Sequence, residues 1–304
     1  MKRKSLILLA LASLASGMAT FGAETPPPGT ILRAEKPILV DGVLDEPCWK
    51  AATPVRADYI NSKQGVLSDE PHLLVRYAYD DQYLYIAYET FDRNLIALGT
   101  GKKQGPDDNP REGCVIWKDG VKVDVVEFFI SFGDEHFFWE IHHNAANQFN
   151  DIWCTVFDPA WPIAKSAMAP FGIVFGDEMS IPDDGPHKLA RAVRPKARAD
   201  GKPSTVNDPA DTDTGYTAEI RLPWLGIGAP AACRTWVERE PAEPGKPKVK
   251  EPGSWKMEGQ VIHIIAAVQD GDLAERYHHS SPTRNGGWFH KSFRDWPRYR
   301  LDLK

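Results

Sequence analysis

Residues 123–144 constrain the fold more than any other stretch of the chain. They contain two runs rich in aromatic and β-branched residues, separated by Gly133-Asp134-Glu135, a pattern typical of a β-hairpin with a short polar turn. Side chains alternate between the two faces of a strand, and residues 124–131 carry apolar side chains on both faces. The first run is therefore predicted to be a central strand.

Glu127 is the unusual residue of this strand because its neighbours are apolar. Burying a carboxylate without a partner costs several kcal/mol. Glu127 must therefore either pair with a neighbouring cation, such as Arg76, or face a ligand. The sequence leaves both alternatives open.

Other strand-like segments repeat the pattern of short apolar runs bounded by turn residues. They cover residues 38–40, 72–79, 83–91, 148–157, 168–174, 215–224, 260–268 and 298–303. Segments with helical periodicity are almost absent. The chain is therefore predicted to be all-β, an antiparallel β-sandwich or jelly roll with long loop insertions.

Three segments are predicted to be insertions on the surface. Residues 99–122 are polar and rich in glycine, which predicts an exposed loop that carries Trp117. Residues 180–209 and 239–252 are rich in proline and charged residues, which is typical of surface or disordered segments.

The N-terminal region has the layout of a secretory signal peptide, with three basic residues, an apolar run and then small residues. We predict a signal peptide over residues 1–23, a proline-rich linker over residues 24–35 and a single β-sandwich domain over residues 36–304. The protein is then secreted or periplasmic. No later stretch approaches the length of an apolar membrane span.

The charge of the mature chain argues against nucleic acid as a partner. The formal charge is -6, and removal of the three basic residues near the N-terminus gives -9 (-6 - 3). An acidic protein is repelled by phosphate backbones and by anionic membranes.

The cysteines and histidines do not form a local metal motif. Cys48, Cys114, Cys154 and Cys233 are far apart and include no C-x-x-C pair, so a zinc site made from one short segment has no support. Disulfides and free thiols are both compatible with the sequence. His142 and His143 face opposite sides of their strand, so only one of them could bind an ion together with a distant histidine.

Four segments, taken in order, resemble a family 9 carbohydrate-binding module. They are residues 40–49 (VDGVLDEPCW), 80–85 (DDQYLY), 124–130 (DVVEFFI) and 216–224 (YTAEIRLPW), followed by residues 285–290 (NGGWFH). The resemblance covers about residues 36–304. It implies a β-sandwich that holds a sugar between two tryptophans, beside carboxylates or amides that bind the hydroxyls.

The resemblance also implies a set of carbohydrate-binding residues. Glu127 matches the hydroxyl-binding glutamate, Trp288 one clamp tryptophan and Asn285 its polar neighbour. Trp117 is the candidate for the second clamp, although it lies further upstream than the family motif. Glu140 stands where the sugar-contacting strand of the family has an arginine.

The predicted function is therefore non-catalytic binding of a plant-type glycan such as xylan or cellulose, with a polysaccharide-degrading enzyme as a possible partner. The alternative is a scaffold or accessory protein of the cell envelope that has lost sugar binding and uses its insertions as partner surfaces. No cofactor is expected. Structural calcium, which the family often contains, would suit residues 107–109 or 183–185.

Two further alternatives remain open. Glu127 and Glu140 could form the carboxylate pair of a glycosidase, although the sequence has no G-x-S-x-G, Walker or H-E-x-x-H motif. A related sandwich binds haem through a methionine and a histidine. In this chain, Met168 or Met179 together with His142 or His143 would be the ligands of the haem iron.

Overall fold

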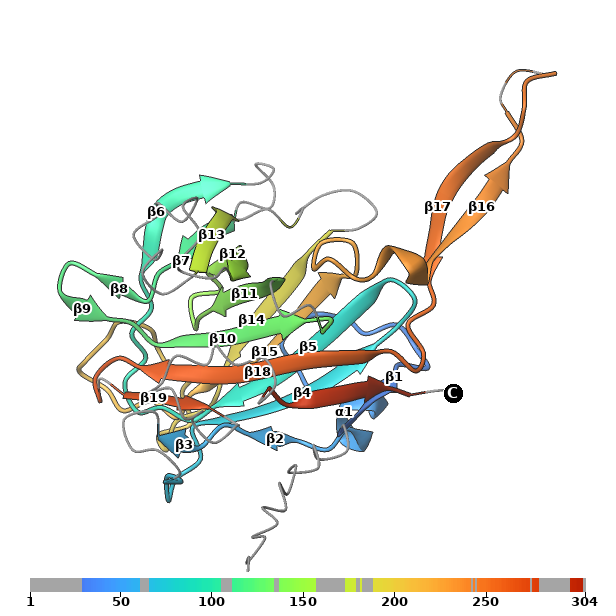
Figure 1. Ribbon diagram of the computed structural model, residues 1–304. Helices are drawn as coiled ribbons and strands as arrows, with labels where there is room; N and C mark the ends of the chain where they lie inside the picture. The colour runs from blue at the N-terminus through green and yellow to red at the C-terminus, as the bar shows by residue number, and fades with distance from the viewer. Residues whose placement is uncertain are drawn as a thin grey trace, which may run out of the picture.

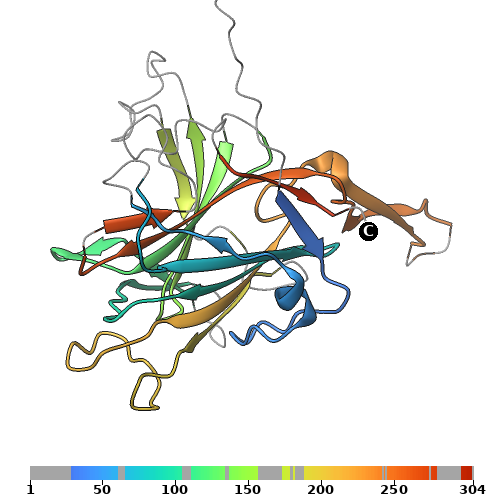
Figure 2. The same ribbon diagram turned by 90° about the horizontal axis from the view of Figure 1, so that it is seen from below.

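The computed structural model describes residues 29–60, 66–104, 111–133, 137–156, 173–178, 181, 188–241, 243, 245–273, 275–278 and 296–302. Two layers of β-sheet enclose one hydrophobic core (Figure 1, Figure 2). The predicted all-β sandwich with mainly antiparallel pairing is confirmed.

The first layer is built around the hairpin that the sequence predicts. Strands β10 (Val125–Ser131) and β11 (Phe137–His143) pair antiparallel, with Glu127 opposite His142. The layer runs in the order β13, β12, β11, β10, β18, β20. The further strands are β12 (Phe149–Val156), β13 (Ile173–Glu178), β18 (Val261–Asp270) and β20 (Arg298–Leu301). Strand β19 (Glu275–His278) pairs with β18, and β3 (Tyr59–Ile60) pairs with β19. Every neighbour of β10 is antiparallel to it.

The second layer contains a further antiparallel hairpin. Its strands are β2 (Val55–Arg56), β4 (Leu73–Tyr79), β5 (Tyr83–Thr90), β15 (Tyr216–Pro223) and β14 (Ala190–Pro195). All pairs in this layer are antiparallel. Helix α1 (Pro47–Ala51) packs Trp49 onto the outer side of the layer, next to Ala78, Tyr85 and Ala87.

Strand β1 (Gly29–Arg33) connects the two layers. Its first residues pair in parallel with β20, and Leu32 and Arg33 pair in parallel with β4. Ile31 is fully buried in the core. The ordered sheet thus begins within the range 24–35 that the sequence assigns to a linker, because one apolar side chain at this position fills the junction between the layers.

The core lies between the inner faces of the two layers. Val126, Phe128 and Ile130 of β10 point into it, as alternation along the strand requires. From the second layer, Ile86, Tyr88 and Ile220 meet them. Trp49, Trp139 and Trp224 are buried, and Trp153 is partly buried against the core.

Two of the predicted insertions contain more regular structure than expected. The exposed loop predicted over residues 99–122 contains two short ribbons, β6 (Gly99–Gln104) with β7 (Arg111–Cys114) and β8 (Trp117–Lys118) with β9 (Val121–Lys122). The segment predicted as disordered or surface over residues 239–252 lies mostly in an antiparallel hairpin. Its strands are β16 (Arg234–Arg239), preceded by η2 (Ala231–Cys233), and β17 (Val249–Trp255).

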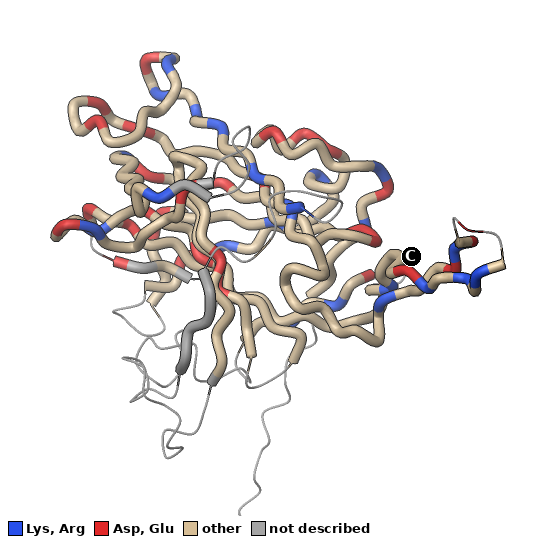
Figure 3. Tube along the Cα trace, turned by 90° about the horizontal axis from the view of Figure 1, so that it is seen from above, with Lys and Arg blue, Asp and Glu red and all other residues tan. Residues whose placement is uncertain are grey.

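We call residues 234–255 the arm, because this hairpin projects away from the sandwich (Figure 1). It exposes Trp236, Val237 and Val249. A free two-stranded ribbon tolerates Pro252, since its outer edges have no further strand to bond. Charged side chains lie mainly in loops and along the arm, whereas the strands of the sandwich carry long uncharged stretches (Figure 3).

The four cysteines are free thiols, so the free-thiol alternative holds and no disulfide supports the sandwich. Within the described residues, no helix is long and apolar enough to cross a membrane.

Candidate functional site

The predicted glutamates lie together on the outer face of the first layer. Glu127 on β10 is directly opposite His142 on β11, and Glu140 is opposite Phe129. Residues that are opposite in an antiparallel pair share a face, and residues two apart on a strand also share it. Glu127, Glu140 and His142 therefore form one polar cluster, which follows from their register on two neighbouring strands.

The cluster is tightly packed. The His142 Nε2 atom lies 2.8 Å from Glu140 Oε1 and 3.6 Å from Glu127 Oε1. One ligand atom from each of the three residues lies within 4.8 Å of the others. The Cys154 thiol of β12 donates to Glu140 Oε2 at 3.6 Å. Burial and the Glu140 charge raise the pKa of Cys154, so the thiol is protonated.

Apolar side chains border this polar cluster on the same face. Phe129, Phe138, Ile152, Ile265 and Trp296 form a second, smaller hydrophobic cluster that also contains Cys154. The ring centroids of Trp296 lie 6.4 Å from Phe129 and 5.6 Å from Phe138. The outer face of the layer is therefore covered rather than open, and Glu127 is 1% exposed.

The surroundings of Glu127 remove one of its candidate partners. Glu127 is 1% exposed and lies beside the apolar cluster on the same face. It does not pair with Arg76. The Arg76 guanidinium lies on the other layer and binds Glu89 at 3.0 Å.

The structure does not bring Trp117 to the glutamates. Trp117 lies on the β8–β9 ribbon and is 67% exposed. Gln269 of β18 holds the base of this ribbon by donating to the carbonyls of Ile116 and Val123, at 2.8 Å each. Trp117 is thus a projecting side chain. Asn285 and Trp288, the other two predicted residues, lie outside the described residues.

His142 and Cys154 complete the polar cluster, and their grouping with the glutamates was not predicted. The spacing Glu140-x-His142 on a strand already places both side chains on one face. Cys154 carries no such signal, because its position depends on the register between β11 and β12, in which Phe138 lies opposite Cys154.

The geometry does not favour a glycosidase. A glycosidase needs two carboxyl groups on either side of a sugar, about 5 to 10 Å apart. The carboxylates of Glu127 and Glu140 lie side by side on one face, with ligand atoms within 4.8 Å. They cannot enclose a substrate between them.

The haem alternative lacks support from His143. This residue is fully buried, and its Nδ1 accepts from the Tyr88 hydroxyl at 2.6 Å while its Nε2 donates to Asn147 at 2.8 Å. Burial lowers the pKa of His143 to about 3. Both ring nitrogens therefore already have a hydrogen-bond partner within the protein, and neither is available to bind haem iron. Met168 and Met179 lie outside the described residues.

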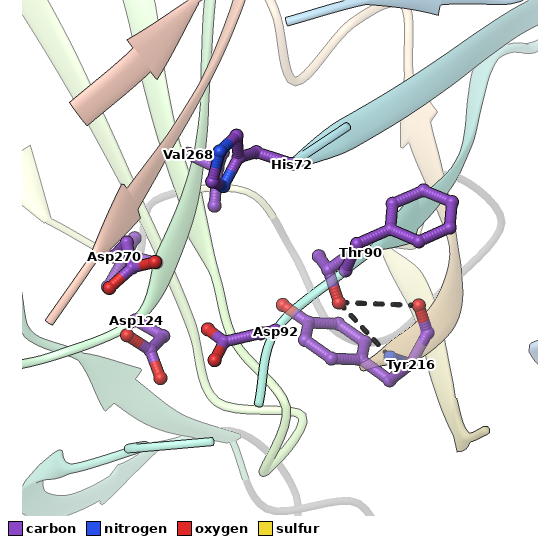
Figure 4. Close-up of a pocket in the computed structure, with 9 residues that line it drawn as sticks. His72, Thr90, Asp92, Asp124, Tyr216, Val268 and Asp270 are labelled. Carbon is purple, nitrogen blue, oxygen red and sulfur yellow. Dashed lines mark hydrogen bonds between the residues drawn. The ribbon is translucent and has the colours of Figure 1, made fainter. Parts of the chain in front are cut away.

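A second polar cluster lies where strands of both layers end, with Asp124 three residues before Glu127 and Asp270 three residues after Ala267, which pairs with Glu127. Asp92 follows β5, Asp124 precedes β10 and Asp270 ends β18. Their carboxyl groups point toward one another (Figure 4). Asp92, Asp270 and Asp272 each place a ligand atom within 4.8 Å of the others. Oxygen ligands of this kind suit a hard cation such as Ca²⁺.

The calcium loops that the sequence suggests, residues 107–109 and 183–185, lie outside the described residues. The acidic cluster was missed because its members come from three separate strand ends. A groove of about 560 Å³ adjoins it, lined among others by His72, Phe91 and Asp213. Of the predicted sugar-contacting residues that the structure describes, Trp117, Glu127 and Glu140 do not line this groove.

The acidic cluster predicts a dependence of stability on pH. Burial, helped by repulsion from neighbouring carboxylates, raises the pKa of Asp92 to about 6 and that of Asp124 to about 8. A carboxyl whose pKa is raised on folding binds its proton more tightly in the folded state, so it favours folding at low pH. This contribution to stability is lost as the pH rises through the pKa of the carboxyl in the folded protein. The melting temperature should therefore fall between pH 5 and pH 8.5 by several degrees.

Thermal unfolding at several pH values checks this expectation. Asp92→Asn should make the decrease smaller, whereas Asp69→Asn, an exposed carboxylate, should leave it as in the unmodified protein. Equal pH profiles for all three proteins would contradict the role assigned to the cluster.

Comparisons with known proteins show what the chain resembles as a whole. No known protein family and no curated protein matches it by sequence. A candidate carbohydrate-binding protein from Bacteroides uniformis has a similar structure, with 12% identity, a TM-score of 0.51 and a match that covers 90% of this chain and 100% of that chain.

Two structures of a family 9 carbohydrate-binding module from Caldicellulosiruptor kristjanssonii, in complex with cellotriose and with glucose, also match. Both are 11% identical and cover 90% of this chain, with TM-scores of 0.44 and 0.45 and coverage of 94% and 96% of those chains. At such low identity, likeness identifies the fold alone. The chain thus has the β-sandwich fold of the candidate carbohydrate-binding protein from Bacteroides uniformis.

Proposed function

We propose that this protein is an exported, non-catalytic carbohydrate-binding protein. The observation that carries the proposal is the pair of carboxylates, Glu127 and Glu140, on one face of an otherwise apolar layer. Carboxylates are suited to bind vicinal hydroxyls, and ligand sites combine a few such groups with apolar walls. The fold shared with the candidate carbohydrate-binding protein from Bacteroides uniformis supports the same function.

The position of the chain on either side of residues 279–295 also supports the proposal. His278 pairs with Ala267, which pairs with Glu127 on its other side. Trp296 packs on Phe129 of the same face. His278 and Trp296, the described residues on either side of residues 279–295, therefore both belong to the layer that carries the carboxylates.

The ligand class follows from burial. A sugar that contacts Glu127 is largely removed from water, which favours a short oligosaccharide or a chain end over the flat surface of a crystalline polymer. Xylan- and cellulose-derived oligosaccharides are the first ligands to test. Stacking and a few hydrogen bonds give a Kd on the order of micromolar to millimolar.

Calorimetric titration with xylo- and cello-oligosaccharides tests the site. Trp288→Ala is expected to weaken binding by about fivefold or more, because stacking of a sugar on an indole contributes at least about 1 kcal/mol. Glu127→Gln should weaken binding as well, since the amide cannot accept as many hydroxyl hydrogen bonds.

Trp236→Ala is the matched control, because Trp236 is an exposed tryptophan of the arm. Unchanged affinity in both Trp288→Ala and Glu127→Gln would disprove the site. Release of reducing ends from the same oligosaccharides would instead contradict the non-catalytic role.

The alternative function, an envelope scaffold without sugar binding, is favoured by one feature. The arm exposes Trp236, Val237 and Val249 on a projecting hairpin, as a partner surface would. A glycan array without any bound glycan would favour this alternative. Export itself is proposed from the signal-peptide pattern of residues 1–23, and a polysaccharide-degrading enzyme is the partner that fits the proposed ligand.

A further inference from the structure

Strand β16 forms a free edge of the arm. Within the part of the chain that the structure describes, β16 pairs with β17 and with no other strand. The arm projects from the sandwich (Figure 1), which leaves this edge accessible. An unpaired edge presents a row of backbone N–H and C=O groups, which can accept a further strand. The edge of β16 can therefore bind a strand of another molecule.

The two edges of the arm differ in the features that prevent such pairing. Strand β17 contains Pro252, which lacks an N–H group, and an extra residue of β17 interrupts its register with β16 between Arg234 and Trp236. Prolines and bulges are features with which natural proteins block an edge. Strand β16 has no proline, and its central residues Trp236 and Val237 are 59% and 50% exposed. Of the two edges, β16 is thus the one open to pairing.

Three side chains make one face of β16 complementary to itself. Arg234, Trp236 and Glu238 alternate along the strand and therefore lie on the same face. The Arg234 guanidinium carbon lies 5.8 Å from the centroid of the Trp236 ring, as expected for neighbours on one face. The tryptophan is midway between the two charges. A copy of the strand that runs in the opposite direction therefore presents Glu238 opposite Arg234, and Trp236 opposite Trp236.

The two charges of this face have no ion-pair partner within the arm. Three ion pairs lie along the arm, Arg239 with Glu251, Lys246 with Glu243 and Lys248 with Glu240. Among the described residues, neither Arg234 nor Glu238 forms an ion pair, and the buried Nε atom of Arg234 has no hydrogen-bond partner there. Both charges are therefore available to a second copy of the strand.

We propose that the chain forms a two-fold symmetric dimer, in which the β16 strands of two copies pair antiparallel around Trp236. The same contact is then made twice, as a two-fold axis requires. Parallel pairing would instead place Arg234 opposite Arg234 and Glu238 opposite Glu238, and like charges directly opposite one another destabilise a strand pair. The dimer goes beyond carbohydrate binding and does not depend on it.

The size of the contact sets its strength. Two strands of 6 residues, with one pair of indole rings, bury less surface than a standard protein interface. The Kd of the dimer is therefore expected to be on the order of 10 to 100 µM. The chain is then monomeric at the low concentrations used to measure unfolding.

Sedimentation velocity of the full-length protein, at concentrations from about 1 to 300 µM that span this Kd, tests the proposal. We expect a shift from monomer to dimer as the concentration rises. No larger species should form, because a two-fold contact closes on itself.

Charge reversal tests the register of the strands. Glu238→Arg and Arg234→Glu should each raise the Kd of the dimer by about tenfold or more, because each variant places like charges opposite one another at both ends of the strand pair. An equimolar mixture of the two variants should dimerise again. In the mixture one chain is positive at both positions and the other is negative at both.

Trp236→Ala should raise the Kd of the dimer by about fivefold or more, since the central pair of rings is lost. Trp117→Ala, which removes an exposed tryptophan of the other ribbon, is the matched control and should dimerise like the unmodified protein. Circular dichroism establishes that each variant is folded. An unmodified protein that stays monomeric at every concentration would overturn the proposal. So would larger oligomers, or a dimer that Glu238→Arg and Trp236→Ala leave unchanged.

Discussion

Replacement of Glu219 by alanine is expected to lower the free energy of unfolding by about 4 kcal/mol, because it leaves several buried donors without an acceptor. Glu219 is almost fully buried on β15. Its carboxylate accepts the backbone N–H groups of Asp41 at 3.0 Å and Gly42 at 2.9 Å and the indole N–H of Trp49 at 2.8 Å. One side chain thus fixes the turn before α1 and the helix itself to the second layer.

Urea unfolding at pH 8 measures this effect. Burial raises the pKa of Glu219 to about 7, so the carboxylate is mostly ionised at that pH. Glu238→Ala, an exposed glutamate on the arm, should change the free energy of unfolding by less than about 0.5 kcal/mol. A loss below about 1 kcal/mol in Glu219→Ala would show that water replaces the missing acceptor.

Gly215→Ala is expected to lower the free energy of unfolding by about 3 kcal/mol or more, since strain and a steric clash add. Gly215 has a φ of +101°, and a Cβ atom there would collide with the backbone carbonyl of Thr90. Thr90 is itself held in place, because its hydroxyl accepts the N–H of Tyr216 at 3.1 Å (Figure 4). The backbone cannot yield without disturbing the junction of β5 and β15.

Gly245→Ala is the matched control for this substitution. Gly245 also has a positive φ, +86°, but no atom lies within 4 Å of the Cβ position. Its replacement should cost only about 1 kcal/mol, the ordinary penalty for this backbone region. Thermal unfolding of the two variants separates the cost of the steric clash from the cost of the backbone strain. An equal loss of stability in both variants would contradict the close approach of Thr90 to Gly215.

The sandwich could be predicted from the sequence because burial and alternation agree along its long strands. In β10, apolar residues on both faces correctly indicated a central strand, and the structure covers one face with the main core and the other with the smaller cluster around Phe129. The strand-like segments predicted at residues 72–79 and 83–91 likewise correspond to β4 and β5.

The arm and the small ribbons could not be predicted in the same way. Backbone hydrogen bonds between two strands hold β16 to β17, and these bonds leave no trace in the pattern of apolar residues. The segment contains Pro252 and many charged residues, which in composition resemble a disordered insertion. The same limit applies to the ribbon that carries Trp117.

The candidate site was predicted in part. Glu127 and Glu140 were identified from the sequence, and the structure brings them together with His142. Their burial was not predicted, because it depends on tertiary packing: Trp296, which is distant in sequence, packs on Phe129 and Phe138 beside the glutamates. The grouping of Asp92, Asp124 and Asp270 also depends on tertiary structure, since each carboxyl comes from a different strand end.

The pairing of the first strand with the last has a consequence for how the molecule is made. Gly29–Arg33 leaves the ribosome well before its partners Tyr299, Arg300 and Leu301 are synthesised. Until they arrive, β1 can pair only with β4, and the seam between the layers stays open. Closure of the sandwich therefore waits for residues 299–301, and their removal would leave β1 paired with β4 alone.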